Sequence, residues 1–280
     1  MGLGVAPKEP KLYKDAMAYE HIALTREDGV VTLTFNRPES RNSMTPAMGD
    51  EVIRAVKEIS ADREARVVVL TGAGKAFSSG GDLSMLARDA GVSQEGSSMG
   101  GSPRDFYNQY LTVRQLPMPT IAAINGHAIG AGLCIALACD LRIAVSDAKM
   151  GMTFTRLGIH PGMGGTWSLP RLIGTARAAE LFFTGRVIDA TEAERLGIVS
   201  RALSRDEFPA AVQSLAREIA AAAPIVNRML KKSIYRGVTH TLDEMLDYES
   251  INQGITFSTE DAREGIRAVM EKREPHFKGR

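Results

Sequence analysis

Two glycine-rich turns are the stretches of this sequence whose residue types and spacing could do chemistry. They are FSSGGDL at 77–83 and NGHAIGAG at 125–132, and each follows an apolar run and precedes a helix-like one. Such turns leave backbone N–H groups unpaired, and the start of a helix adds partial positive charge. Two N–H donors that converge from separate turns would form an oxyanion hole. Glycine also permits tight turns and close helix packing, so spacing alone leaves both interpretations open.

Other signatures of catalysis or nucleotide binding are incomplete or absent. Gly72-Ala73-Gly74-Lys75 resembles part of a phosphate loop, but Ala76 stands where Ser or Thr is required. The sequence has no G-x-G-x-x-G after a strand, no H-E-x-x-H and no G-x-S-x-G. These patterns disfavour nucleotide hydrolysis, hydride transfer on a Rossmann site and zinc proteolysis.

The two turns lie in a chain that alternates strands and helices. Short β-branched or apolar runs predict strands at 30–35, 66–71, 119–124 and 141–145. Thr45-Pro46 opens a predicted helix, and a second predicted helix follows the glycine turn at 131–138. This alternation predicts an α/β fold with parallel pairing of strands.

The two ends of the chain differ from this alternating middle. Glycine and proline interrupt residues 1–17 and predict a flexible N-terminal arm. The last third is helical, with an apolar stripe from Phe208 to Ile219 and a final amphipathic helix at 258–272. The low-complexity stretch GVSQEGSSMGGS at 91–102 predicts a flexible loop.

Composition bounds the class of protein. The 280 residues carry 34 basic and 33 acidic side chains, a net charge of +1, with no run of like charge. This balance argues against nucleic-acid and membrane-surface partners. Cys134 and Cys139 lie in an apolar stretch without zinc-ligand spacing, no apolar run reaches the length of a membrane span, and the N-terminus has no targeting character. We therefore expect a cytoplasmic protein.

Six segments, in order, resemble the crotonase (enoyl-CoA hydratase/isomerase) superfamily from about Tyr19 to the C-terminus. They are FNRPESRNSM at 35–44, GAGKAFSSGGDL at 72–83, PTIAAINGHAIGAG at 119–132, LACDLRIA at 137–144, PGMGGTWSLPRLIG at 161–174 and EKREPHF at 271–277. The resemblance implies a spiral core of repeated ββα units over 18–203, which carries the CoA and oxyanion sites. It also implies a helical region over 204–280 that builds trimers or dimers of trimers, and acyl thioesters of coenzyme A as ligands.

The resemblance assigns expected roles to individual residues. The two oxyanion donors are expected to be the backbone N–H groups of Gly81 and Ala131. The residues expected to contact CoA are Arg41 and Lys75, the backbone of Ala76 and Phe77, and, often from a neighbouring subunit, Phe257 and Lys272. For each basic side chain the alternative is a solvated surface charge. No metal or redox cofactor is implied, and coenzyme A enters only as part of the substrate.

The sequence departs from the family where side chains do the chemistry. Hydratases of the family use two glutamates, and the matching positions here are Cys134 and Phe154. The Cys139-Asp140 anchor between them aligns without a gap, and the extra aspartate of dienoyl-CoA isomerases falls on Gly162. A positioned acid or base is worth about 10²–10⁴-fold in rate, so standard glutamate-dependent hydration is disfavoured.

Replacement proton carriers are His160 and, more speculatively, Cys134. His127 has an expected structural role, and Asp82 is expected to cap the next helix. Arg104, Tyr107, Tyr110 and Arg114 could each face the acyl chain or solvent. The leading hypothesis is an acyl-CoA enzyme that stabilises a thioester enolate. The alternatives are a non-catalytic acyl-CoA-binding protein, or isomerisation, decarboxylation or β-diketone cleavage.

Overall fold

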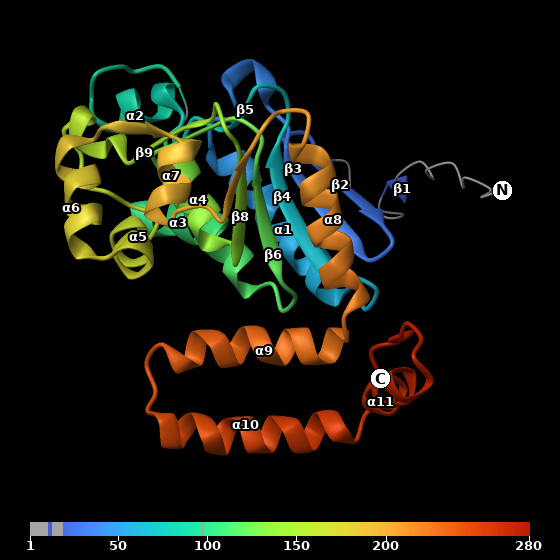
Figure 1. Cartoon of the computed structure of the whole chain (residues 1–280). Helices are drawn as coiled ribbons and strands as arrows, with labels where there is room; N and C mark the ends of the chain where they lie inside the picture. Colours follow the sequence, from blue (N-terminus) through green and yellow to red (C-terminus); the bar gives the residue numbers. More distant parts are fainter. Residues whose placement is uncertain (1–10, 13–18, 97) are drawn as a thin grey trace.

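The structure is a computed structural model that describes residues 11–12, 19–96 and 98–280. Two sheets form the body of the protein (Figure 1). In these residues a seven-stranded sheet has the order β1-β2-β3-β4-β6-β8-β11, and a four-stranded sheet has the order β10-β9-β7-β5. The strands of the first sheet are β1 (Lys11–Leu12), β2 (Ile22–Glu27), β3 (Val30–Phe35), β4 (Val67–Gly72), β6 (Thr120–Ile124), β8 (Leu141–Val145) and β11 (Arg201–Leu203). Those of the second are β5 (Ala76–Ser78), β7 (His127–Ile129), β9 (Lys149–Gly151) and β10 (Val187–Asp189).

Pairs of strands repeat through the body. β4, β6 and β8 lie next to one another in the large sheet with parallel pairing, and each is followed at once by β5, β7 or β9 in the small sheet. A helix comes after each pair. This ββα repeat confirms the predicted α/β crotonase fold, and it brings the glycine turns that follow β5 and β7 to the same edge of the small sheet.

Helices cover both faces of the large sheet. α1 (Pro46–Ala61) begins at Thr45, whose side chain accepts a hydrogen bond from the Met48 N–H, and Pro46 occupies its first position. α8 (Phe208–Ala221) lies along β3, β4 and β8. The other helices of the body are α2 (Leu83–Asp89), α3 (Pro103–Leu111), α4 (Ala131–Ala138), α5 (Gly165–Ile173), α6 (Thr175–Thr184) and α7 (Ala190–Leu196), with 3₁₀ turns at Pro38–Ser40, Thr112–Gln115 and Thr153–Leu157.

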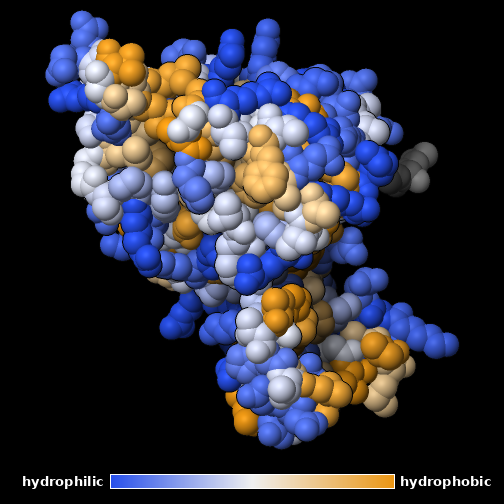
Figure 2. All heavy atoms as spheres, turned by 90° about the vertical axis from the view of Figure 1, so that its left-hand side faces the viewer, coloured by the Kyte–Doolittle hydropathy of each residue, from blue (hydrophilic) through white to orange (hydrophobic). Residues whose placement is uncertain are grey.

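Three helices project from the body as a C-terminal arm: α9 (Pro224–Gly237), α10 (Leu242–Phe257) and α11 (Glu260–Glu271) (Figure 1). The Asp140 carboxylate holds α9 to the sheet, because it accepts from Tyr235 at 2.7 Å and lies 2.8 Å from the Lys231 ammonium. α10 buries none of its residues, and exposed apolar side chains are visible on the projecting part in Figure 2.

The elements expected from the sequence are found within one or two residues. The strand expected at 66–71 is β4, the helix at 131–138 is α4, and the helix at 258–272 is α11, which begins after Thr259. Of the predicted flexible arm over 1–17, only Lys11 and Leu12 are described, and they pair with β2. The other residues of that arm lie outside the described ones. Among the described residues no helix is long and apolar enough to cross a membrane.

Candidate active site

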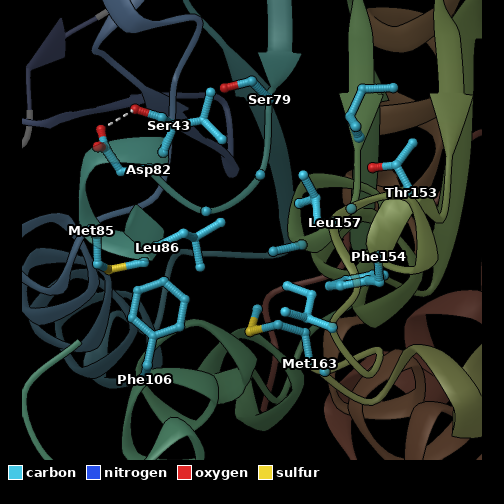
Figure 3. Close-up of a pocket in the computed structure, with 18 of the residues that line it drawn as sticks. Ser43, Ser79, Asp82, Met85, Leu86, Phe106, Thr153, Phe154, Leu157 and Met163 are labelled. Carbon is cyan, nitrogen blue, oxygen red and sulfur yellow. Dashed lines mark hydrogen bonds between the residues drawn. The ribbon is translucent and has the colours of Figure 1, made fainter. Parts of the chain in front are cut away.

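An apolar cavity of about 600 Å³ opens beside the two glycine turns. Its walls come from α2, α3 and the segment 153–163, and its apolar lining includes Met85, Leu86, Phe106, Phe154, Leu157 and Met163. Figure 3 shows these side chains pointing toward a common space. Gly81 and Ala131 both line the same cavity.

The glycines press the two turns against each other. Gly80 has φ +92°, and a Cβ on it would stand 2.6 Å from the Ile129 carbonyl oxygen. A Cβ on Gly132, in the first turn of α4, would stand 2.3 Å from the Ser78 carbonyl oxygen. Since real Cβ atoms do not approach backbone oxygens so closely, both positions require glycine. The close contact therefore fixes how the turn after β5 meets the start of α4.

The N–H groups of Gly81 and Ala131 have no backbone acceptor among the described residues. On either side of Gly81, the Met44 N–H donates to the Gly80 carbonyl and the Asp82 N–H donates to the Met44 carbonyl, which leaves the Gly81 N–H between them. Ala131 is the first residue of α4, so its N–H has no intrahelical partner and lies at the positive end of the helix. Two residues of the cavity lining, at its rim, thus have N–H groups without a backbone acceptor.

Phe154 lines the cavity, whereas Cys134 lies behind the cavity lining, in the core. Cys134 is 1% exposed and does not line the cavity; its Sγ lies 3.8 Å from the Met152 Sδ and 3.6 Å from the Gly162 carbonyl oxygen. Burial raises the pKa of this thiol to about 12, so it stays protonated, and its surroundings favour packing. The Phe154 ring does line the cavity, near Gly130.

His160 lines the cavity and is exposed. Its Nδ1 lies 2.8 Å from the Pro161 carbonyl oxygen. A carbonyl oxygen only accepts, so Nδ1 donates in this contact, and Nε2 is the ring nitrogen without a hydrogen bond to any described residue. A neutral imidazole in this orientation would offer Nε2 as a base. His127, in contrast, accepts from the Lys149 N–H at 3.0 Å, which ties β7 to β9.

Two carboxylates line the cavity among the described residues, Glu39 and Asp82. Asp82 caps α2, as expected, since its Oδ1 accepts from the Ser84 N–H while its Oδ2 accepts from the Ser43 hydroxyl. Burial alone would raise the pKa of Asp82, but the hydrogen bonds from Ser84 and Ser43 outweigh it and lower the pKa. Asp82 is therefore an ionised structural group.

The residues expected to contact CoA divide into two sets. Arg41 lines the cavity mouth, and Lys75 is exposed in the turn between β4 and β5. Ala76 and Phe77 are buried in β5, where the Phe77 ring packs edge-on against Phe35. The side chain of Phe77 is thus part of the core, and only its backbone is available.

Phe257 and Lys272 form the second set. Both are exposed at the ends of α10 and α11 in the arm, and neither lines the cavity of its own chain. Of the four side chains whose direction the sequence left open, Tyr107 lines the cavity and Arg104 is exposed. The Tyr110 hydroxyl donates to Thr45, and Arg114 stacks on Trp167.

Repeated strand pairs, a helical C-terminal arm and two facing glycine turns define a crotonase-type α/β protein. The model of the enoyl-CoA hydratase/isomerase family matches residues 25–280, and the chain belongs to this family. It is 38% identical to the 1,2-epoxyphenylacetyl-CoA isomerase of Escherichia coli, over 91% of this chain and 97% of that one. It is 34% identical to the crotonyl-CoA hydratase of Syntrophomonas wolfei, over 93% and 99%.

A solved structure agrees with these sequence relatives. The crystal structure of an enoyl-CoA hydratase from Bacillus anthracis has a TM-score of 0.84 with 37% identity, and covers 93% of this chain and 100% of its own. The relatives therefore include both hydratases and an isomerase along their full length.

Proposed function

We propose that this protein acts on acyl-CoA thioesters and stabilises the thioester enolate through the N–H groups of Gly81 and Ala131. The observation that carries this proposal is that Gly81 and Ala131, in two turns packed against each other, line one apolar cavity and have N–H groups without a backbone acceptor. An enolate places its charge on the thioester oxygen, which two such donors would bind. The relatives support the substrate class, because the name of each contains a CoA ester.

The polar part of coenzyme A would lie at the cavity mouth. Arg41, which lines the cavity, and the exposed Lys75 would hold its phosphates and adenine, together with the Ala76–Phe77 backbone. Phe257 and Lys272 would reach a CoA on another copy of the chain, in a trimer or dimer of trimers. Their exposure on the arm supports this arrangement.

His160 would move the proton at the acyl carbon, because it lines the cavity and its Nε2 makes no hydrogen bond to a described residue. Cys134 is the weaker alternative, since its thiol points into the core. The water-activating pair of glutamates expected of a hydratase is replaced by Cys134 and Phe154, which favours enolate chemistry other than standard hydration, such as double-bond isomerisation.

The same replacement favours one alternative, a protein that binds acyl-CoA without turnover. The two functions differ in what happens to a bound ester. An enzyme converts it, whereas a binding protein is stabilised against heat by the ester and releases it unchanged.

The absorbance of the conjugated enoyl thioester tests the proposal directly. Purified protein is mixed with a short and a medium trans-2-enoyl-CoA, alongside His160→Ala and Cys134→Ala. We expect any turnover to survive Cys134→Ala and to fall about 10²-fold in His160→Ala, the lower end for a positioned base. Binding of these CoA esters without conversion would favour the binding protein, and failure to bind any acyl-CoA would refute both.

A further inference from the structure

Two tyrosines of α3 face different surroundings although they are three residues apart. Tyr110 is fully buried, and its hydroxyl donates to the Thr45 carbonyl oxygen at 2.6 Å, which ties α3 to the start of α1. Tyr107 is partly buried and lines the cavity. Its hydroxyl makes no hydrogen bond to any residue that the structure describes. The phenol of Tyr107 is therefore free to donate to a ligand.

The absence of a side chain at Gly162 makes room for this phenol. A Cβ on Gly162 would stand 2.5 Å from both Cζ and Oη of Tyr107, so the tip of the ring lies directly against the Gly162 backbone. The neighbours in sequence, Phe106 and Met163, point into the cavity from the same two segments (Figure 3). The hydroxyl thus occupies the place that a side chain at 162 would take.

The phenol is also close to the first turns of α4. The Cys134 Sγ lies 3.6 Å from the Gly162 carbonyl oxygen, and Ala131 begins the same helix one turn earlier. Burial first, and then the nearby Cys134, raise the pKa of Tyr107. The hydroxyl therefore keeps its proton at neutral pH. Because Asp82 is ionised and the Cys134 thiol points into the core, neither competes with it as a donor.

We propose that the Tyr107 hydroxyl is the proton donor of this site and protonates the carbon of the enolate. The O–H bond of the phenol breaks as the electron pair of the enolate double bond forms the new C–H bond, and the thioester carbonyl is restored. Solvent then returns a proton to the phenolate and takes up the proton that His160 removed. This inference rests on the proposed function, because it requires the enolate.

Deuterium exchange distinguishes a separate proton donor, here Tyr107, from a single base that both removes and returns the proton. In D₂O a donor distinct from the base delivers solvent deuterium to the carbon beside the thioester, whereas a lone base returns the proton that it removed. The probes are hexanoyl-CoA and phenylacetyl-CoA, and deuterium uptake is followed by mass spectrometry. We expect uptake with the natural protein and a loss of about 10²-fold in Tyr107→Phe, with the Kd for each ester within threefold.

Tyr110→Phe is the matched control, since it removes a phenol from the same helix outside the cavity. It should melt at a lower temperature and keep its exchange rate within threefold when assayed below that temperature. Uptake in Tyr107→Phe within threefold of the natural protein would overturn the proton-donor role and leave the proposed function standing. A Kd raised more than tenfold with an unchanged saturated rate would also overturn it, because the phenol would then only position the ester. No uptake by the natural protein with either ester would also overturn the donor role, since a lone base that returns its own proton gives none, and the enoyl-CoA absorbance assay described above would then decide whether the proposed function stands.

Discussion

The rim and the wall of the same cavity are built in different ways. The rim presents main-chain N–H groups, at Gly81 and Ala131, held by glycine contacts between β5 and α4. The wall presents side chains, among them Phe154, Tyr107 and His160. In the proposal above, the rim supplies the oxyanion donors, and Cys134 and Phe154 stand where the sequence comparison expects the glutamates of a hydratase. The rim would stabilise the negative charge on the thioester oxygen, and the wall would move the proton. Substitutions can therefore perturb the rim or the wall separately.

The largest effect is expected from Ala131→Pro, which deletes one donor of the rim. Proline suits the first position of a helix, so α4 should persist while its ring replaces the N–H. Loss of one oxyanion donor costs about 2.7–4 kcal/mol, which predicts a fall in kcat of about 10²–10³-fold. The measurement is the turnover or deuterium exchange of an acyl-CoA, with melting temperature as a check on folding.

Gly81→Ala is the control for that variant. It keeps the N–H, and its Cβ would make ordinary contacts of 3.6–3.8 Å with Met85 and Leu86. We expect its rate to stay within about threefold of the natural protein, as for a residue whose donor is intact. If the rim acts only as a tight turn, the two variants should not differ, and Ala131→Pro should be as active as Gly81→Ala.

Gly132→Ala should perturb the rim without deleting a donor. The new methyl group would meet the Ser78 carbonyl oxygen at 2.3 Å and push α4 away from β5. Overpacking of this kind typically costs about 1–3 kcal/mol of stability. We expect a lower melting temperature and a rate reduced about tenfold, because a misplaced donor loses part of its effect. An unchanged rate in a destabilised variant would show that the spacing of the two turns is not critical.

Arg41→Gln tests the mouth of the cavity, a region separate from the N–H groups of the rim and the side chains of the wall. Its guanidinium is exposed, so its loss should cost about 1 kcal/mol or less of binding. We expect KM for the CoA ester to rise by about three- to fivefold with kcat unchanged, an effect that added salt should diminish. A fall in kcat instead would assign Arg41 to the wall.

The smallest effect on rate is expected from Cys134→Ala. Burial holds the pKa of this thiol near 12, above its unfolded value of about 8.5. The neutral thiol is therefore favoured by folding below pH 8.5, and that contribution to stability is lost as the pH rises toward 12. Alkylation of the folded protein should remain slow up to pH 9, and Cys134→Ala should keep its rate within about threefold. Rapid alkylation that abolishes activity would instead make the thiol part of the wall.

Local patterns predicted the helices and strands well, because residues adjacent in sequence determine them. Examples are the apolar run VVVLTG at 67–72, which forms a strand, and Thr45-Pro46, which begins a helix. The direction of a side chain depends on contacts that are distant in sequence. Tyr107 and Tyr110 differ because Gly162 leaves space for one while Thr45 accepts from the other. Cys134 belongs to a helix whose residues are all buried, so no amphipathic pattern shows which side chain faces the cavity.

If further copies of the chain cover the projecting arm, as proposed above, the protein will be sensitive to dilution. α10 exposes Leu242, Leu246, Ile251 and Ile255, so within one chain half or more of the surface of each residue stays in contact with solvent. Contacts supplied by further copies would disappear as the concentration falls, and the apparent melting temperature would fall with it. The body has its own core and an anchor to α9 at Asp140, so it should outlast the arm. In very dilute solution we therefore expect the cavity to persist after the helices that bear Phe257 and Lys272 have lost their order.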